Sequence, residues 1–154
     1  MAHVTDALRS RGRATSIEER VFESVMLAAD HLLRGEVDVL RSADLTFPQY
    51  NVLRILRGAR PEGLSCGAIS QRMITRDSDL TRILDRLQER RLVKRVRDPQ
   101  DRRIMVAEIT DAGLQVLRTL DAPINRVHRE QLKHMTQERL ERLRALAEEV
   151  RGGG

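Results

Sequence analysis

Apolar residues recur at helical spacing over most of this chain of 154 residues. Between residues 16 and 43 they stand three or four positions apart, which predicts one amphipathic helix. Its stripe consists of Ile17, Val21, Val25, Ala28 and Leu32. Gly35 lies in the second half of this segment, where the pattern weakens, and is a candidate position for a kink.

The next stretch carries clear signals for the start of a second helix. Residues 45–53 read LTFPQYNVL. Thr46 and Gln49 have the spacing of a capping box, in which each side chain accepts a hydrogen bond from the other residue's backbone. Pro48 falls in the first turn, where its missing N–H costs no hydrogen bond. We expect this helix to end near Gly58.

A third, short helix is predicted from Ser65, whose hydroxyl can cap it. A fourth helix follows, with Asp77 or Ser78 as its N-cap, and ends near Arg90. Its apolar face repeats at i, i+3, i+4 and i+7 through Leu80, Ile83, Leu84 and Leu87. Its opposite face is polar and consists of Asp79, Thr81, Arg82, Asp85, Arg86 and Glu89.

The period changes after the fourth helix. Residues 92–97 (LVKRVR) and 103–109 (RIMVAEI) are short and rich in β-branched residues, and a charged turn separates them, which predicts a β-hairpin. Helical spacing returns from Thr110 onward, with an interruption expected near Pro123. Thr136 can cap the last helix, whose apolar positions are Leu140, Leu143, Ala147 and Val150.

This order predicts a mainly α fold with a small β-hairpin wing, namely a winged helix-turn-helix flanked by N- and C-terminal helices. In that geometry the fourth helix enters the major groove of DNA by its N-terminal end. The hairpin tip then reaches the adjacent minor groove, where Arg102 and Arg103 can insert. Asp98 and Asp101 are expected to pair with these arginines and set their rotamers. The alternative is a solvated turn held by exposed ion pairs.

The composition narrows the class of partner and the chemistry. Lys and Arg total 28 against 23 Asp and Glu, a formal net charge of +5, which suits either a surface that faces phosphates or solubility alone.

The single cysteine, Cys66, excludes an internal disulfide and favours a reducing, cytoplasmic setting. The four histidines lack metal-ligand spacing, and no phosphate loop or nucleophile motif is present. We therefore expect no metal, no cofactor and no enzyme activity, and no apolar run reaches the ~18 residues of a membrane span.

Three segments carry a family resemblance: residues 45–56 (LTFPQYNVLRIL), 79–103 (DLTRILDRLQERRLVKRVRDPQDRR) and 109–117 (ITDAGLQVL). With the flanking helices, over about residues 16–150, the chain resembles the multiple-antibiotic-resistance regulator (MarR) family of bacterial transcription factors. The resemblance implies a homodimer that binds palindromic operator DNA, often as a repressor released by a small ligand. It also implies that the first and last helices intertwine as the dimer interface.

Four segments are expected on this basis. They are a flexible basic arm over 1–15, an N-terminal dimerisation helix over 16–44, a winged helix-turn-helix DNA-binding domain over 45–110 and C-terminal dimerisation helices over 111–151. The residues expected at the dimer interface are Ile17, Val21, Val25, Leu140, Leu143, Ala147 and Val150.

Candidate DNA contacts lie on the recognition helix and on the wing. Those of the recognition helix are Arg76, Ser78, Asp79, Thr81, Arg82 and Arg86. Those of the wing are Arg97, Asp98, Asp101, Arg102 and Arg103. The chain departs from the family at Asp77 and Asp79, where members often carry Ser, Thr or Asn. Both carboxylates suit the helix dipole but repel phosphates, so each is either a cap or an acceptor for a cytosine amino group.

An effector cleft between the dimerisation and DNA-binding parts has three aromatic candidates, Phe22, Phe47 and Tyr50. Two other functions stay open, a winged helix protein-interaction module without specific DNA binding and a constitutive DNA binder without a ligand. Weak, sequence-insensitive affinity for DNA would favour the first. Cys66 is expected to be a partly buried, unreactive thiol, since the oxidant-sensing cysteine of relatives lies in the first helix.

Overall fold

The computed structural model describes residues 15–75 and 79–152. Its helices are α1 (Ile17–Leu40), α2 (Phe47–Gly58), α3 (Cys66–Arg72), α4 (Leu80–Glu89), α5 (Asp111–Leu132) and α6 (Gln137–Val150), with a 3-10 turn, η1 (Arg41–Ala43), after α1. The strands are β1 (Leu64–Ser65), β2 (Val93–Arg97) and β3 (Met105–Ile109). The chain divides into two compact units, Met1–Leu33 and Arg34–Gly154, and α1 crosses the boundary between them.

The second unit is organised around one hydrophobic core. Apolar side chains of α2, α4 and the first half of α5 meet there with side chains of β2 and β3. The largest fully buried side chains are Leu40, Leu53, Leu56, Ile69, Leu84, Leu87, Leu117, Val52 and Val93. Burying one such side chain contributes about 1.5–3 kcal/mol, so the core fixes how α4 and the hairpin lie against α2 and α5.

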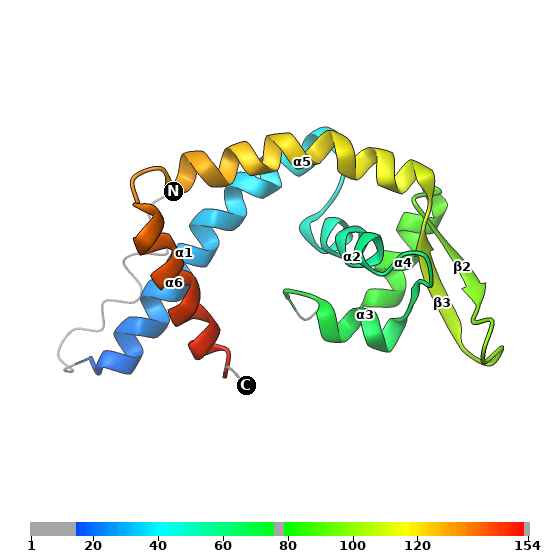
Figure 1. Cartoon of the computed structure of the whole chain (residues 1–154), viewed down its shortest axis with the longest axis horizontal. Coiled ribbons are helices and arrows are strands. Elements are labelled where there is room, and N and C mark those ends of the chain that lie inside the picture. Colours follow the sequence, from blue (N-terminus) through cyan, green and yellow to red (C-terminus); the bar gives the residue numbers. More distant parts are fainter. Residues whose placement is uncertain (1–14, 76–78, 153–154) are drawn as a thin grey trace. The chain divides into compact units, whose positions relative to one another are not determined.

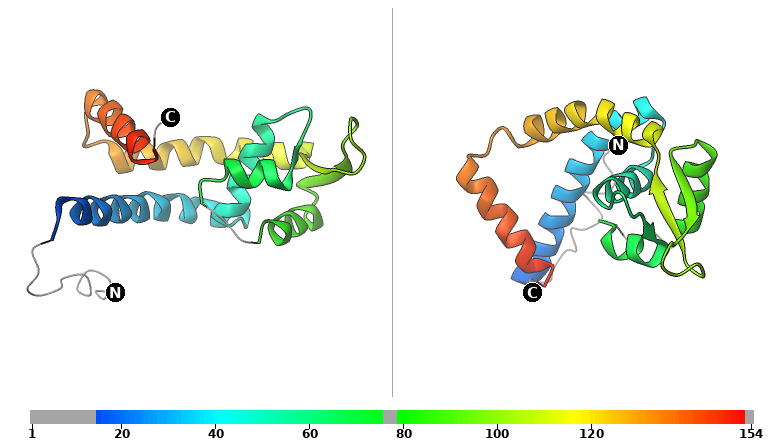
Figure 2. Two further views of the ribbon diagram at one scale, coloured as in Figure 1. Left: turned by 90° about the horizontal axis from the view of Figure 1, so that it is seen from below. Right: turned by 45° about the vertical axis from the view of Figure 1, so that its right-hand side comes forward.

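The sheet has three antiparallel strands in the order β1-β3-β2. Strands β2 and β3 form the expected hairpin, with Val93 opposite Ile109 and Arg97 opposite Met105. Its turn projects away from the helices (Figures 1 and 2). The predicted fold class, mainly α with a hairpin wing, is confirmed. The sequence did not indicate β1, because two residues are too few to show an alternating pattern.

Three helices begin at the caps predicted for them, Thr46, Ser65 and Thr136. Thr46 and Gln49 form both bonds of a capping box at α2: the Gln49 N–H donates to Thr46 Oγ1 at 3.4 Å, and the Thr46 N–H donates to Gln49 Oε1 at 3.0 Å. Ser65, Thr110 and Thr136 cap α3, α5 and α6 in the same way, each hydroxyl accepting from a backbone N–H three residues on. Local sequence therefore fixes where these helices begin.

Two expected interruptions are absent. Helix α5 runs continuously through Pro123, although a proline inside a helix costs about 3 kcal/mol. Leu120 and Ile124 on either side of it are buried in the core, and this packing holds the helix together. Helix α1 likewise continues through Gly35, where an added Cβ would lie 2.5 Å from Cγ1 of Val127. Gly35 therefore allows α1 and α5 to approach closely, and the helix is not broken at this residue.

Large apolar side chains are exposed at both ends of the sequence. Within Met1–Leu33, Ile17, Val21 and Val25 are exposed, and so are Phe22, Met26 and Leu27. In the second unit, Leu143, Leu146 and Val150 are exposed on α6. Across the part of the chain that the structure describes, no helix combines the length and the apolar character that crossing a bilayer requires.

Candidate nucleic-acid interface

Helix α4 separates its apolar and polar residues on opposite faces, as predicted. Leu80, Leu84 and Leu87 are buried, and Ile83 packs against the same core. The predicted polar residues Asp79, Thr81, Arg82, Asp85, Arg86 and Glu89 are all exposed, as is Gln88. The core thus presents one polar helix face to the outside, which is the geometry of a recognition helix.

The N-cap of α4 is Asp79 rather than Asp77 or Ser78. Its Oδ1 accepts a hydrogen bond from the Arg82 N–H at 3.3 Å, and its Oδ2 lies 3.9 Å from Arg82 Nη1. The prediction of the cap at Asp77 or Ser78 was wrong, because α4 begins at Leu80 and a cap must directly precede the first helical residue. The capping bond engages one carboxylate oxygen of Asp79. Asp77 and the candidate contacts Arg76 and Ser78 lie outside the described residues.

Arg86 projects from α4 between two shallow cavities. One of about 320 Å³ is lined by Arg41, Asp44, Leu45, Thr46, Gln49, Arg86, Glu89 and Arg90. The other, of about 380 Å³, is lined by Thr46, Pro48, Gln49, Asp79, Arg82, Ile83 and Arg86. Both cavities place the N-terminus of α2 beside the polar face of α4. Among the described residues no hydrogen bond or ion pair engages the Arg86 side chain, so its charge is available to a phosphate.

Backbone hydrogen bonds shape the wing turn between β2 and β3. Oδ1 of Asp98 accepts from the N–H groups of Gln100 and Asp101, at 2.7 Å and 3.1 Å, and Oδ1 of Asp101 accepts from the Arg103 N–H at 3.0 Å. The expectation that these carboxylates pair with the wing arginines was wrong. The turn leaves several N–H groups without strand partners, and the nearby carboxylates satisfy them first.

The arginines of the wing divide into two kinds. Arg97 donates to the Arg102 carbonyl at 2.7 Å and so helps to hold the turn. The side chains of Arg102 and Arg103 are exposed, and within the described residues neither has a hydrogen bond or an ion pair. The wing therefore presents two uncommitted guanidinium groups on a turn whose backbone is fixed.

Two residues that link α4 to its surroundings were not identified from the sequence. Arg90, at the end of α4, donates to the carbonyls of Ala43 and Asp44, at 2.9 Å and 2.5 Å, in the segment between α1 and α2. Arg95 of β2 contacts Thr81 and Asp85 of α4. Both resemble ordinary surface arginines in the sequence, since their partners lie 10 to 47 positions earlier and only the tertiary fold brings them together.

Comparison with known proteins identifies the family. The MarR family model matches residues 43–104, from the end of η1 to the end of the wing turn. The transcriptional repressor IacR of Pseudomonas putida is 30% identical over 112 residues, which are 73% of this chain and 66% of IacR. The crystal structure of a MarR transcription factor from Planctomyces limnophilus is 34% identical with a TM-score of 0.66, covering 88% of this chain and 98% of that one.

The chain belongs to the MarR family. PcaV of Streptomyces coelicolor, solved in complex with its natural ligand, is 29% identical with a TM-score of 0.71 over 92% of this chain and 96% of its own. The chain spans about half to two thirds of the length of the curated relatives that it matches. These relatives are transcriptional regulators, not enzymes.

The aromatic residues that the sequence suggested for a MarR effector cleft differ in their surroundings. Tyr50 is 3% exposed and lies in the core, while Phe47 packs against that core. Burial raises the pKa of the Tyr50 phenol, and this effect exceeds that of the Arg54 guanidinium, which lies 5.6 Å from the ring centroid and lowers the pKa. Phe22 belongs to the unit Met1–Leu33 and is 65% exposed.

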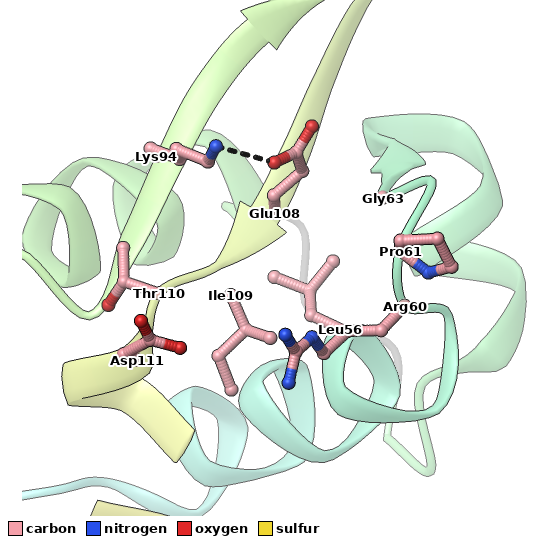
Figure 3. Close-up of a pocket in the computed structure, with 9 residues that line it drawn as sticks. All are labelled: Leu56, Arg60, Pro61, Gly63, Lys94, Glu108, Ile109, Thr110 and Asp111. Atoms are coloured by element: carbon pink, nitrogen blue, oxygen red, sulfur yellow. Dashed lines mark ion pairs between the residues drawn. The ribbon is translucent and has the colours of Figure 1, made fainter. Parts of the chain in front are cut away.

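A cavity of about 410 Å³ opens elsewhere on the second unit (Figure 3). Its residues come from the end of α2, the loop before β1, the paired strands β2 and β3, and the start of α5; they are Leu56, Arg60, Pro61, Gly63, Lys94, Glu108, Ile109, Thr110 and Asp111. Lys94 and Glu108 form an ion pair of 2.8 Å at its edge. Phe47 and Tyr50 are not among its lining residues, so it is distinct from the predicted cleft.

Cys66 is exposed, and the expectation of a partly buried thiol was wrong. It occupies the first position of α3, whose apolar anchor is Ile69, so its own side chain stays outside the core. In the described ranges no three His, Cys, Asp or Glu side chains gather as metal ligands would.

Proposed function

We propose that this chain is a sequence-specific DNA-binding transcription regulator. The observation that carries the proposal is the pairing of the exposed polar face of α4 with a hairpin whose tip presents Arg102 and Arg103, neither of which has a side-chain partner among the described residues. In this arrangement the helix reads base edges in the major groove, while the wing arginines bind the minor groove or the phosphates beside it. Membership of the MarR family supports the proposal.

Within α4 we assign base reading to Thr81 and Arg82 and phosphate contact to Arg86. Thr81 and Arg82 occupy the first turn and are exposed, and a guanidinium can bind guanine in a bidentate way. Arg86 lies one turn further on and faces the N-terminus of α2, a position that suits the backbone. Ser78 and Arg76, just before α4, remain candidates.

We further propose that the protein works as a homodimer through α1 and α6. The exposed apolar residues of both helices supply the reason, because apolar patches of this kind on a soluble protein usually mark an interface. Two copies related by a two-fold axis would read half-sites about one helical turn apart, which predicts a palindromic operator. Sedimentation at micromolar concentration tests this, and a stable folded monomer would contradict it.

Regulation is proposed from relatives. IacR is named a repressor, and PcaV was solved with a natural ligand, so we propose repression in the cytoplasm, relieved by a small molecule. The cleft with Phe22, Phe47 and Tyr50 remains the proposed place for it. The four segments expected from the sequence, with boundaries at 15, 44 and 110, likewise remain proposals.

The test of the proposed function is a footprint on the DNA beside the chain's own gene, followed by affinity measurements on the protected sequence and on a scrambled copy. Arg82→Ala should lose about 1–3 kcal/mol on the operator and little on scrambled DNA. Arg118→Ala, which removes an arginine on α5 bonded to Gln115, is the matched control and should change neither affinity. If the unmodified chain binds both sequences equally weakly, the result contradicts specific DNA binding and supports a role as a protein-interaction module.

A further inference from the structure

Arg95 of β2 is bound to α4 at two points. Its Nη2 lies 2.7 Å from Oδ1 of Asp85, and the same nitrogen donates to the Thr81 carbonyl at 3.2 Å. The Arg95 side chain is 26% exposed, and that of Asp85 is 51% exposed. The guanidinium is thus half-buried between the helix and the sheet, with a carboxylate and a helix carbonyl as its partners.

The alternation of side chains along β2 explains this direction. Neighbouring residues of a strand point to opposite faces of a sheet. Lys94 pairs with Glu108 of β3 at the edge of the 410 Å³ cavity, on the face away from α4. Arg95 therefore points towards α4, and Arg97, two residues further on, lies on the same face as Arg95.

This face carries a series of contacts from the helix to the tip of the wing. Thr81 belongs to the first turn of α4, beside Arg82. Arg95 joins that turn to β2, and Arg97 joins the end of β2 to the Arg102 carbonyl in the wing turn. The two elements proposed to bind DNA are therefore connected by two successive arginine side chains as well as by the backbone.

We propose that Arg95 is a positioning residue for DNA binding, which fixes the orientation of the wing relative to α4 without contacting DNA. The proposal rests on the proposed function and extends it to a residue outside the predicted contacts. The core holds the base of the hairpin through Val93 and Ile109, while Ile104 and Met105 near its tip are exposed and lie outside that core. A guanidinium that binds α4 at two points holds the outer part of the hairpin against the helix, so the helix and the wing are oriented before they meet the DNA.

The chemistry of the side chain makes Arg95 specific for this role. Both contacts are made by Nη2, whose two N–H groups are held in the plane of the guanidinium, while a lysine ammonium is a compact charge on a flexible stem and does not hold its donors in fixed directions. Arg95→Lys should therefore lose part of the affinity for the operator, although the charge is kept. Arg95→Met keeps the apolar stem and removes the donors.

The experiment uses the full-length chain and its footprinted operator. Affinity is measured over a series of salt concentrations, together with hydroxyl-radical footprints, for Arg95→Met, Asp85→Asn and the double variant. Thermal unfolding of each variant shows whether it is folded, so that affinities are compared at equal concentrations of folded protein. Lys94→Met, on the same strand and in an ion pair of similar length, is the matched control.

We expect Arg95→Met to weaken operator binding about 10- to 30-fold, because lost preorganisation is added to the cost of association. The slope of log affinity against log salt should fall no further than in the Arg102→Ala, Arg103→Ala variant, because only the contacts of the wing tip are weakened. Minor-groove protection by the wing should fade while major-groove protection by α4 persists. Asp85→Asn should reproduce the effect, and the double variant should be no worse than either single variant.

Three results would overturn the inference. A further fall of the salt slope by about one, when Arg95→Met is added to the Arg102→Ala, Arg103→Ala variant, would mean that Arg95 itself binds a phosphate. Equal fading of both kinds of protection would mean a general loss of structure, and an unchanged affinity would mean that Arg95 has no role. If the unmodified chain has no preferred sequence, the proposed function fails, and that result is seen before any variant is made.

Discussion

Nε2 of His128 lies 2.6 Å from Oε1 of Glu36, and this contact joins α5 to the last turns of α1. Glu36 is 9% exposed, and its second oxygen, Oε2, has no hydrogen-bond partner among the described residues. The adjacent residue Gly35 allows the two helices to approach closely. A buried carboxylate therefore depends on one imidazole for its hydrogen bond.

His128→Ala should lower the free energy of unfolding by about 1–3 kcal/mol, because it leaves the Glu36 carboxylate buried without a donor. The same substitution in a Glu36→Ala background should cost much less, since the group that needs a donor is gone. Urea unfolding at one fixed protein concentration measures both. His134→Ala, at an exposed position outside this contact, is the control and should change stability by no more than about 0.5 kcal/mol. Additive effects of the two substitutions would contradict the coupling.

Tyr50 is the only tyrosine of the chain, so its ionisation can be followed by ultraviolet absorbance. Burial raises its pKa above the ordinary value of 10.0, and the carboxylates of Glu36 and Asp121 act in the same direction. The Tyr50 phenol then ionises less readily in the folded state than in the unfolded state. The free energy of unfolding should therefore fall as pH rises above about 10. The midpoint of the absorbance titration of Tyr50 should return to about pH 10 in denaturant.

Tyr50→Phe is the variant that checks this linkage. It removes the ionising hydroxyl and keeps the aromatic ring, so the loss of stability at alkaline pH should be smaller than in the unmodified chain. Urea unfolding at pH 7 and at pH 10.5 gives the comparison. An identical alkaline loss in both proteins would assign the effect to other groups.

Gly113 lies in the first turn of α5, where an added Cβ would clash with the Leu92 carbonyl oxygen and lie 2.7 Å from Cγ1 of Ile109. The carbonyl cannot move easily because it accepts the Thr110 N–H at 3.0 Å. Gly113→Ala should therefore destabilise the protein by about 1–3 kcal/mol. Gly67→Ala in α3 meets nothing within 4 Å and should be neutral or stabilising by up to about 1 kcal/mol. Equal stability of both variants would show that the start of α5 adjusts freely.

The wing prediction concerns electrostatics. Changing both Arg102 and Arg103 to Ala should weaken binding to every DNA sequence and lower the salt slope by roughly one for each lost phosphate contact. Folding should be preserved, because the turn is held by Asp98, Asp101 and Arg97 and not by these two side chains. A slope that stays the same would return the wing to the solvated-turn interpretation.

Local signals were sufficient for most of the secondary structure. The capping box at Thr46 and the caps at Ser65 and Thr136 act within three residues, so sequence spacing alone locates them. The apolar stripe of α4 predicted its buried face, and the change to an alternating pattern predicted the hairpin. The family resemblance, carried by contiguous motifs, was confirmed by comparison.

What the sequence missed depends on contacts between distant segments. Pro123 and Gly35 were interpreted by local propensity, but core packing beside Pro123 and the close contact with Val127 decide their structures. Asp98 and Asp101 were assigned to arginine side chains by charge, yet the backbone of the turn takes their oxygens. The roles of Arg90 and Arg95 are visible only in the fold, because a hydrogen bond between residues far apart in sequence leaves no periodic signal. The sequence alone thus determined the elements and their polar faces, while tertiary packing decided which charged side chains hold the structure and which remain available to a partner.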